Sequence, residues 1–280
     1  MSHYVLSAFA DEYDASVKQQ LFALSCFGIG QIELRGVNGK NISSLTAGET
    51  AELGQLLDEH GIKVCAIGSP IGKIALDGDM DAHFALAQNT FEIARTLGAR
   101  YVRMFSFYAP EGKKITECRE QVLDALGKLL DLADKYGVVL CHENEAAIYG
   151  DIPERCAELA EHFDKRLRCV FDMGNFVLEG IDPLAAYARL QQHIAYFHVK
   201  DALYAGAVVP PGKGEAHIAE ILDAHQAFAE EDFFVSLEPH LQTFDGLNAL
   251  VGRSFENPYQ YPDARAAFED AVNKFKEIMQ

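Results

Sequence analysis

Four short apolar segments of the chain each end in a side chain that can bind a metal ion. They are VVLCHE, which ends at Glu143, RCVFD at Asp172, IAYFH at His198 and FFVSLE at Glu238. Carboxylate oxygens and an imidazole nitrogen suit Mn²⁺, Mg²⁺ or Co²⁺, and Zn²⁺ also accepts them. If the segments are strands of one sheet that run in the same direction, the four side chains meet at one rim. The pattern therefore predicts a divalent-metal site and an enzyme.

The composition indicates a chain with a large core and a strongly acidic surface. Of the 280 residues, 49% are hydrophobic and 24% are charged, which suffices for one large α/β domain or two small ones. The formal net charge of −18 repels polyanions and no basic patch offsets it, so we expect no nucleic-acid partner. A small anionic substrate is compatible with this charge if lysine and arginine side chains line its pocket.

The sequence carries no signal for export, membrane insertion or disulfide formation. The N-terminus MSHYVLSAFADE lacks a basic start followed by an apolar run, and no uncharged apolar stretch reaches the roughly 18 residues of a membrane helix. The six cysteines include no C-x-x-C pair. We therefore expect a cytoplasmic protein without a membrane partner, a disulfide framework or a structural zinc site.

Short β-branched or aromatic runs alternate with longer amphipathic stretches along the whole chain. The strands are expected at residues 3–10, 31–35, 63–68, 101–107, 138–143, 168–172, 194–200 and 233–238. The helices are expected at residues 15–27, 47–60, 80–97, 115–136, 153–162, 183–192, 216–230 and 262–279. Several helices end at a glycine stop signal, at Gly28, Gly61, Gly98 and Gly137.

Eight strands, each followed by a helix, predict a (β/α)₈ TIM barrel in which residues 1–280 form a single domain. The length fits the roughly 250 residues typical of that fold. The alternative is an open doubly wound sheet, which would place its site at one topological switch point. The barrel is favoured because no G-x-G-x-x-G turn follows the first strand and polar residues occur at the ends of all eight strands.

Alternation along the strands sends the proposed ligands into the mouth of the barrel. In residues 31–35 the apolar positions should face helices, so that Glu33 and Arg35 point inward. His198 shares a face with Tyr196 and Lys200 by the same rule. A single polar strand end could be only a terminator of its strand, but four at matching ends favour a metal site.

The chain also resembles a known family in its motifs. The segments HENEAAIYGD, FDMGNFVLEG, YFHVKDA, PPGKGEAHIAEIL and VSLEPHL are similar to the xylose isomerase-like TIM barrels, in particular the sugar phosphate isomerase/epimerase group. The N-terminal segments AFADE, IELRGVNGKNIS and AIGSPIGKI resemble a bacterial branch of the same group. The resemblance spans essentially the whole chain.

The resemblance implies one divalent metal ion held by Glu143, Asp172, His198 and Glu238, with Mn²⁺ the first choice and Mg²⁺, Co²⁺ or Zn²⁺ as alternatives. It also implies that Glu143 and Glu238 are catalytic and carry protons on opposite faces of the substrate. The ion acts as a Lewis acid, so that a carboxylate can remove a proton from carbon and an enediolate can form.

The chain departs from the family pattern at Asn175, where many relatives have histidine. Asparagine hydrogen-bonds a hydroxyl group but is a poor metal ligand and neither an acid nor a base. Apurinic endonucleases share the fold but hold three zinc ions with additional histidines. Asn175 and the net charge of −18 therefore argue against a nuclease.

Basic and polar residues at other strand ends are candidates for substrate binding. They are Arg35, Lys73, Arg103, Glu145, Asn175, Lys200, Lys213 and His240. Arginine suits a carboxylate or phosphate. The compact loop 210–215 around Lys213 is a candidate to receive an anion through its backbone N–H groups, and the alternative is that it forms only a turn. The alternative for Arg35 and Arg103 is pairing with Glu33, Asp11 or Glu12 inside the barrel.

These residues predict a metal-dependent isomerase or epimerase of a small sugar, sugar phosphate or sugar acid. A lyase that dehydrates a keto-inositol or keto-sugar is the nearest alternative, and a non-catalytic sugar-binding barrel is an alternative of another class. We expect a small carbohydrate as the partner and a homodimer or tetramer as the assembly. The long segment 242–261 is expected to form a lid or an oligomer contact.

Overall fold

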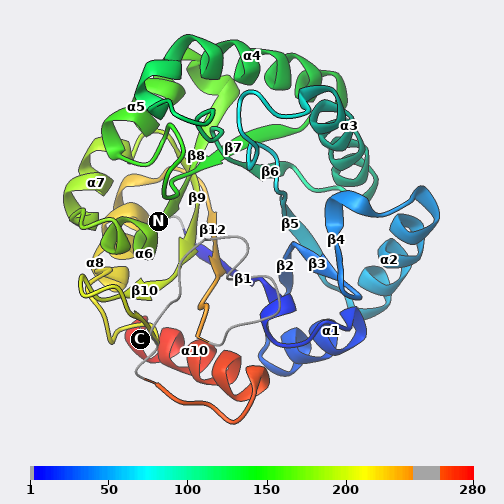
Figure 1. The fold of residues 1–280 in the computed structure, drawn as a ribbon. Coiled ribbons are helices and arrows are strands. Elements are labelled where there is room, and N and C mark those ends of the chain that lie inside the picture. The colour runs from blue at the N-terminus through cyan, green and yellow to red at the C-terminus, as the bar shows by residue number, and fades with distance from the viewer. Residues whose placement is uncertain (1–2, 242–258) are drawn as a thin grey trace.

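The eight apolar runs of the sequence form eight parallel strands that roll into a nearly closed barrel (Figure 1). The computed structural model describes residues 3–241 and 259–280. The strand order around the barrel is β1-β12-β9-β8-β7-β6-β5-β2, and the end strands β1 and β2 are in contact. The strands are β1 (Tyr4–Ala8), β2 (Gln31–Leu34), β5 (Lys63–Gly68), β6 (Tyr101–Met104), β7 (Val139–Glu143), β8 (Leu167–Asp172), β9 (Ile194–Val199) and β12 (Phe233–Leu237). The (β/α)₈ prediction is confirmed.

Helices surround the barrel as a ring, with α10 beside α1 where the chain closes (Figure 1). They are α1 (Val17–Cys26), α2 (Ala47–His60), α3 (Met80–Leu97), α4 (Arg119–Tyr136), α5 (Pro153–His162), α6 (Met173–Leu178), α7 (Pro183–Leu190), α8 (Ile218–Phe228) and α10 (Ala264–Ile278). None of the helices within the described ranges combines the length and apolar character needed to cross a membrane.

Local signals explain where these units begin and end. Thr46 and Glu49 form a reciprocal capping box at the start of α2. Gly61, Gly98 and Gly137 end α2, α3 and α4 in the left-handed conformation, as their sequence positions predict. Each of these three helices therefore stops a few residues before the next strand of the barrel.

Several small elements were not predicted. Short hairpins follow two barrel strands: β3 (Gly36–Val37) with β4 (Lys40–Asn41), and β10 (Asp201–Ala202) with β11 (Val208–Val209). Two-residue strands are too short to show a period of alternation, which is why the sequence pattern missed them. Helix α6 was also missed. Of the segment 242–261, expected as a lid or contact, residues 242–258 lie outside the described part of the chain.

The barrel interior changes from apolar to polar along each strand. Cys141, Val170 and Tyr196 belong to a buried cluster inside the barrel, where Tyr196 stacks on Phe234 with ring centroids 4.2 Å apart. A second, larger cluster fills the space between strands and helices. Glu143, Asp172 and His198 lie two residues after Cys141, Val170 and Tyr196, so alternation directs them to the same side of their strands. The apolar cluster therefore closes the barrel beneath the polar rim.

A close contact between Gly72, in the loop after β5, and the backbone of Phe105 leads to a prediction about stability. Gly72 has φ +85°, and a Cβ atom there would lie 1.9 Å from the backbone oxygen of Phe105. We expect Gly72→Ala to lower the free energy of unfolding by about 1–3 kcal/mol more than Gly98→Ala, because it adds overpacking to the strain of a positive φ. Gly98 has φ +71° and open space around it, so it isolates the conformational strain. Urea unfolding of both variants measures the difference in the free energy of unfolding. Equal losses of stability in the two variants would contradict the close contact between Gly72 and Phe105.

Candidate functional site

The structure brings the four predicted metal ligands together at the carboxyl ends of their strands. Glu143 ends β7, Asp172 ends β8, His198 lies near the end of β9, and Glu238 follows β12. All four are buried, and one potential ligand atom from each lies within 4.8 Å of those of the others. Parallel strands place their carboxyl ends at one rim, so residues up to 95 positions apart in sequence converge without any local motif.

Each of the two glutamates has one oxygen bound by an arginine and the other directed to the centre. Arg103 Nη1 donates to Glu143 Oε2 at 2.8 Å, and Arg35 Nη1 donates to Glu238 Oε1 at 2.7 Å. The remaining oxygens, Glu143 Oε1 and Glu238 Oε2, lie 3.0 and 3.3 Å from His198 Nδ1. Burial opposes ionisation, but nearby positive charge lowers the pKa of Glu143 to about 2 and that of Glu238 well below its usual value. Both groups are therefore carboxylates at neutral pH.

Glu33 fixes the orientation of His198 from inside the barrel. Its Oε2 lies 3.0 Å from His198 Nε2, and its Oε1 accepts a hydrogen bond from the Tyr196 hydroxyl at 2.9 Å. The ring of Phe9 packs edge-on against His198 with centroids 5.0 Å apart. Burial would lower the pKa of His198, but Glu33 and Glu143 outweigh it and raise this pKa well above its usual value. With Nε2–H bound to Glu33, Nδ1 is the nitrogen that faces the carboxylates.

Lys200 and two asparagines hold Asp172. Lys200 Nζ donates to Asp172 Oδ2 at 2.8 Å and to Asn175 Oδ1 at 3.0 Å. The Asn144 side-chain amide donates through Nδ2 to the backbone oxygen of Asp172 and accepts through Oδ1 from its backbone N–H. The Asn175 backbone N–H donates to Asp172 Oδ1. A Cβ at Gly174 would lie 2.7 Å from Lys200 Cγ, so only glycine lets α6 approach this lysine. Burial raises the pKa of Asp172 to about 7, against the lowering effect of Lys200.

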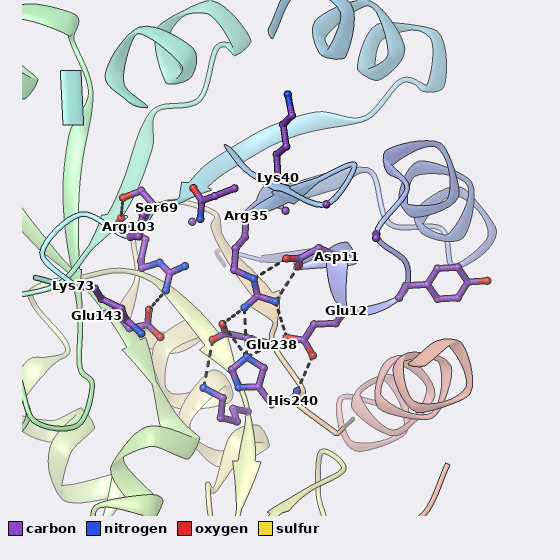
Figure 2. A pocket seen from close by; sticks show the side chains of 18 of the residues that line it. Asp11, Glu12, Arg35, Lys40, Ser69, Lys73, Arg103, Glu143, Glu238 and His240 are labelled. Atoms are coloured by element: carbon purple, nitrogen blue, oxygen red, sulfur yellow. Dashed lines mark hydrogen bonds and ion pairs between the residues drawn. The ribbon is translucent and has the colours of Figure 1, made fainter. Parts of the chain in front are cut away.

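On the other side of the centre, Arg35 joins three carboxylates. It bonds Asp11 through Nε and Nη2, Glu12 through Nη2 and Glu238 through Nη1. His240 Nε2 lies 3.3 Å from Glu12 Oε1 and 3.4 Å from Glu238 Oε1, and Figure 2 shows Glu238 between Arg35 and His240. Burial lowers the pKa of His240 to about 4 and raises that of Glu12 to about 8. At neutral pH the His240 ring is therefore uncharged.

This donor set fits a single divalent ion. Glu143 Oε1, Glu238 Oε2 and Asp172 Oδ2 are the oxygens not fixed by an arginine or by a helix cap, and His198 Nδ1 completes the group. Glu33 orients the histidine through its second nitrogen, as carboxylates commonly do behind metal-bound histidines. Three carboxylates and one imidazole favour a hard or borderline divalent cation.

A cavity of about 630 Å³ opens above the centre. Its described lining includes six acidic side chains: Asp11, Glu12, Asp14, Glu143, Glu145 and Glu238. It also includes five basic side chains: Arg35, Lys40, Lys73, Arg103 and Lys200. Phe105, Pro70 and Tyr13 contribute apolar surface, so the cavity offers both hydrogen-bonding groups and carbon surface to a ligand.

Most of the predicted substrate residues reach this cavity. Arg35, Lys73, Arg103, Glu145, Lys200 and His240 line it. The alternative pairing was right for Arg35, which bonds Asp11 and Glu12, whereas Arg103 bonds Glu143, a partner that was not predicted.

Asn175 and Lys213 are not among the described residues that line the cavity. The Asn175 amide is occupied by Lys200 and by the backbone oxygen of Asn144. The expectation that the loop around Lys213 offers free N–H groups was wrong, because Gly212, Gly214 and Ala216 donate their backbone N–H groups to the Asp201 carboxylate. The Asp201 carboxylate thus binds the N–H groups that an anionic ligand would have used.

Two residues with a structural part in the site had no assigned function in the sequence. Glu33 was expected to point inward, but its bond to His198 could not be foreseen from strand alternation alone. Phe9 lies between the two arginines, with its ring centroid 4.5 Å from Arg35 Cζ and 5.6 Å from Arg103 Cζ. A Cβ at Gly68 would lie 2.5 Å from this ring, so a small residue is needed there.

Comparisons with known proteins agree with this architecture. The sequence model of the family described as xylose isomerase-like TIM barrel matches residues 23–271. A curated relative, the rhizopine catabolism protein MocC of Rhizobium meliloti, is 26% identical over 185 residues, covering 62% of this chain and 56% of that protein. The matched part therefore spans little more than half of that relative's length.

Solved structures with low sequence identity share the whole fold. An L-ribulose 3-epimerase has a TM-score of 0.74 at 18% identity and covers 100% of this chain and 95% of its own. The IOLI protein, crystallised with a zinc atom, has a TM-score of 0.73 at 18% identity over 98% and 97% of the two chains. The probable 3-DHS dehydratase AsbF of Bacillus anthracis has a TM-score of 0.72 at 17% identity over 99% of each chain.

The bond between Glu33 and His198 generates a prediction about metal affinity. Glu33→Gln should weaken Mn²⁺ binding about 10–100-fold, because the histidine loses the carboxylate that orients it. Isothermal titration calorimetry measures this affinity, and circular dichroism checks that the variant is folded. Glu120→Gln, which removes an acidic group that is 84% exposed, is the matched control. Unchanged affinity in a folded Glu33→Gln variant would contradict the assigned role.

The pKa shifts of His198 and Asp172 generate a second prediction. Both pKa values are raised, so each group holds a proton at a pH where its free counterpart would already have lost it. An ion needs both sites deprotonated, so Mn²⁺ affinity should rise between about pH 6 and pH 8 and fall below that range. Calorimetry at pH 7 in two buffers of different ionisation enthalpy should detect proton release. Affinity that is flat over this range, with no proton release, would show that the ion binds elsewhere.

Proposed function

This chain belongs to the xylose isomerase-like TIM barrel family, and on that premise we propose that it is a divalent-metal-dependent isomerase or epimerase. Its substrate would be a small sugar, sugar phosphate or sugar acid. The observation that carries the proposal is the pair Glu143 and Glu238, two ionised glutamates held by different arginines around one four-ligand centre. Sugar epimerases among the solved structures of the same fold support the enzyme class.

Glu143 and Glu238 would perform the proton transfer. An ion held by them with Asp172 and His198 would supply Lewis acidity, which makes a C–H bond beside a carbonyl group more acidic. One glutamate would take the proton from carbon and the other would return a proton to the opposite face. Arg103 and Arg35 hold the two carboxylates in place by their outer oxygens, while His198 and Arg103 lower the pKa of Glu143 and Lys200 lowers that of Glu238.

Lys200 and Arg103 would orient the substrate. Lys200 Nζ lies at the edge of the centre, 2.8 Å from Asp172 Oδ2 and 3.5 Å from Glu238 Oε2, and it lines the cavity. Arg103 bonds Glu143 through Nη1 and also lines the cavity. Both can donate to an oxygen that gains negative charge when the carbon loses its proton.

Mn²⁺ is the ion that we propose first, because three carboxylates give the centre a predominantly oxygen character. A structure of the same fold crystallised with zinc makes Zn²⁺ the alternative.

A lyase is the second candidate. The same deprotonated carbon can expel a neighbouring hydroxyl group as water, and the probable dehydratase AsbF has the same fold. A barrel that binds a sugar without reaction is the candidate of another class.

Hydrogen exchange tests these candidates directly. The Mn²⁺-loaded protein should introduce deuterium from D₂O at the carbon beside the carbonyl group in one of a panel of ketoses, their phosphates and a keto-inositol. Glu143→Gln and Glu238→Gln should each lower this rate about 10²–10⁴-fold, because each removes a proton carrier. Mass spectrometry of the recovered sugars gives the rate, and Glu120→Gln should leave it unchanged.

The products separate the alternatives. Deuterium in an epimer or isomer of unchanged composition supports the isomerase, whereas a product lighter by one water identifies the lyase. Absence of bound divalent ion together with no effect of Glu143→Gln on sugar binding would leave the non-catalytic barrel as the function.

A further inference from the structure

Every basic side chain in the described lining of the cavity already has an acidic partner. Arg103 pairs with Glu143, Lys73 with Glu145, and Lys200 with Asp172. Arg35 is shared by Asp11, Glu12 and Glu238, and Lys40 at the exposed rim pairs with Glu49. The described lining therefore presents no uncompensated positive charge to a ligand, although it contains five basic residues.

The Lys73–Glu145 pair is the most informative of these contacts. Lys73 comes from the loop after β5 and Glu145 from the loop after β7, so two segments distant in sequence converge at the cavity wall. Their charged atoms are 3.3 Å apart, and the side chains are only 11% and 14% exposed. Lys73 Nζ also lies 4.3 Å from the centroid of the Phe105 ring. The carboxylate thus takes one of the N–H donors of this ammonium group and compensates its charge.

A phosphate group would meet unfavourable charge here. It carries about −1.5 to −2 at neutral pH and is bound in proteins by unpaired arginine or lysine side chains or by free backbone N–H groups. The loop that could have offered such N–H groups, 210–216, gives them to Asp201. To bind phosphate at Lys73, the protein would have to break the pair and leave the part-buried Glu145 without its partner, beside a second negative charge.

An uncharged sugar suits the same surface. Hydroxyl groups both donate and accept, so they can bond to the carboxylate and ammonium groups of an intact ion pair at once. Arg103 lines the cavity while it keeps its bond to Glu143, so it too is presented to a ligand as part of an intact ion pair. Pro70 and Tyr13, which line the cavity and are part-exposed, supply carbon surface for the C–H face of a sugar.

We infer that this site takes an uncharged polyhydroxylated carbonyl compound and that Glu145 is the residue that excludes phosphorylated analogues. The inference rests on the proposed function for the reaction, but selectivity between a sugar and its phosphate is a property of binding. Glu145 therefore determines specificity through the charge that it cancels on Lys73.

The experiment compares matched pairs on the Mn²⁺-loaded protein. The pairs are L-ribulose with L-ribulose 5-phosphate and D-fructose with D-fructose 6-phosphate, each measured by calorimetry and by deuterium exchange. For wild type, the unphosphorylated member should be favoured about 100-fold or more in affinity or in kcat/KM. Tighter binding of the phosphorylated member in both pairs would overturn the inference.

Glu145→Gln provides the decisive variant. It keeps the shape of the side chain and releases the charge of Lys73, so it should improve binding of the phosphorylated member about 10-fold relative to its partner. Inorganic phosphate alone should also bind more tightly to this variant. Glu111→Gln removes the same charge from an exposed position in the loop after β6 and should change neither ratio. An unchanged ratio in Glu145→Gln would show that this residue does not set the selectivity.

The two proposals fail in different ways. If no member of any pair exchanges deuterium, the proposed reaction is wrong, but the binding ratios and their response to Glu145→Gln still decide the inference. If exchange occurs and the phosphorylated members are preferred, the reaction stands and the inference is wrong.

Discussion

Three carboxylates can share the buried mouth of a barrel only if positive charge is brought against them. Burial opposes the ionisation of Glu143, Asp172 and Glu238, and their mutual repulsion opposes it further. The structure meets this constraint with Arg103 against Glu143, Arg35 against Glu238, and Lys200 against both Asp172 and Glu238. The two arginines bind the outer oxygens of the glutamates, so Glu143 Oε1 and Glu238 Oε2 face the centre, where Lys200 Nζ also bonds Asp172 Oδ2.

Much of the local architecture follows from holding those cations in place. Phe9 lies between the two arginines, and Gly68 leaves room for its ring. Gly174 leaves room for Lys200, and the Asn144 and Asn175 amides fix the backbone around it. Asp201 follows Lys200 in the sequence, and its carboxylate accepts hydrogen bonds from backbone N–H groups of the loop 210–216, which anchors that loop. Residues without chemistry of their own thus decide where the charged groups stand.

The same pairing also gives the cavity its character. Ion pairs buried in a protein interior are costly to break, because the member left behind is a charge without a partner. A ligand that binds one member of such a pair must offset that free-energy cost. Arg103 and Glu143 form such a buried pair at the centre, and Lys73 and Glu145 form a part-buried pair on the wall. A surface of intact pairs offers directional hydrogen bonds without uncompensated positive charge, which suits sugar hydroxyl groups because they both donate and accept.

The sequence by itself determined the barrel and the identity of the four candidate ligands. Period-two alternation and glycine stops are local signals, so the eight strands, the ends of α2, α3 and α4, and the inward direction of Glu33 were all readable from neighbouring residues. Only the tertiary structure decided which side chains meet. Three of these contacts join different strands or loops: Glu33 with His198, Arg103 with Glu143, and Lys73 with Glu145. The hydrogen bonds from loop 210–216 to Asp201 do the same. Such contacts depend on barrel register and on loop paths, which no local pattern encodes.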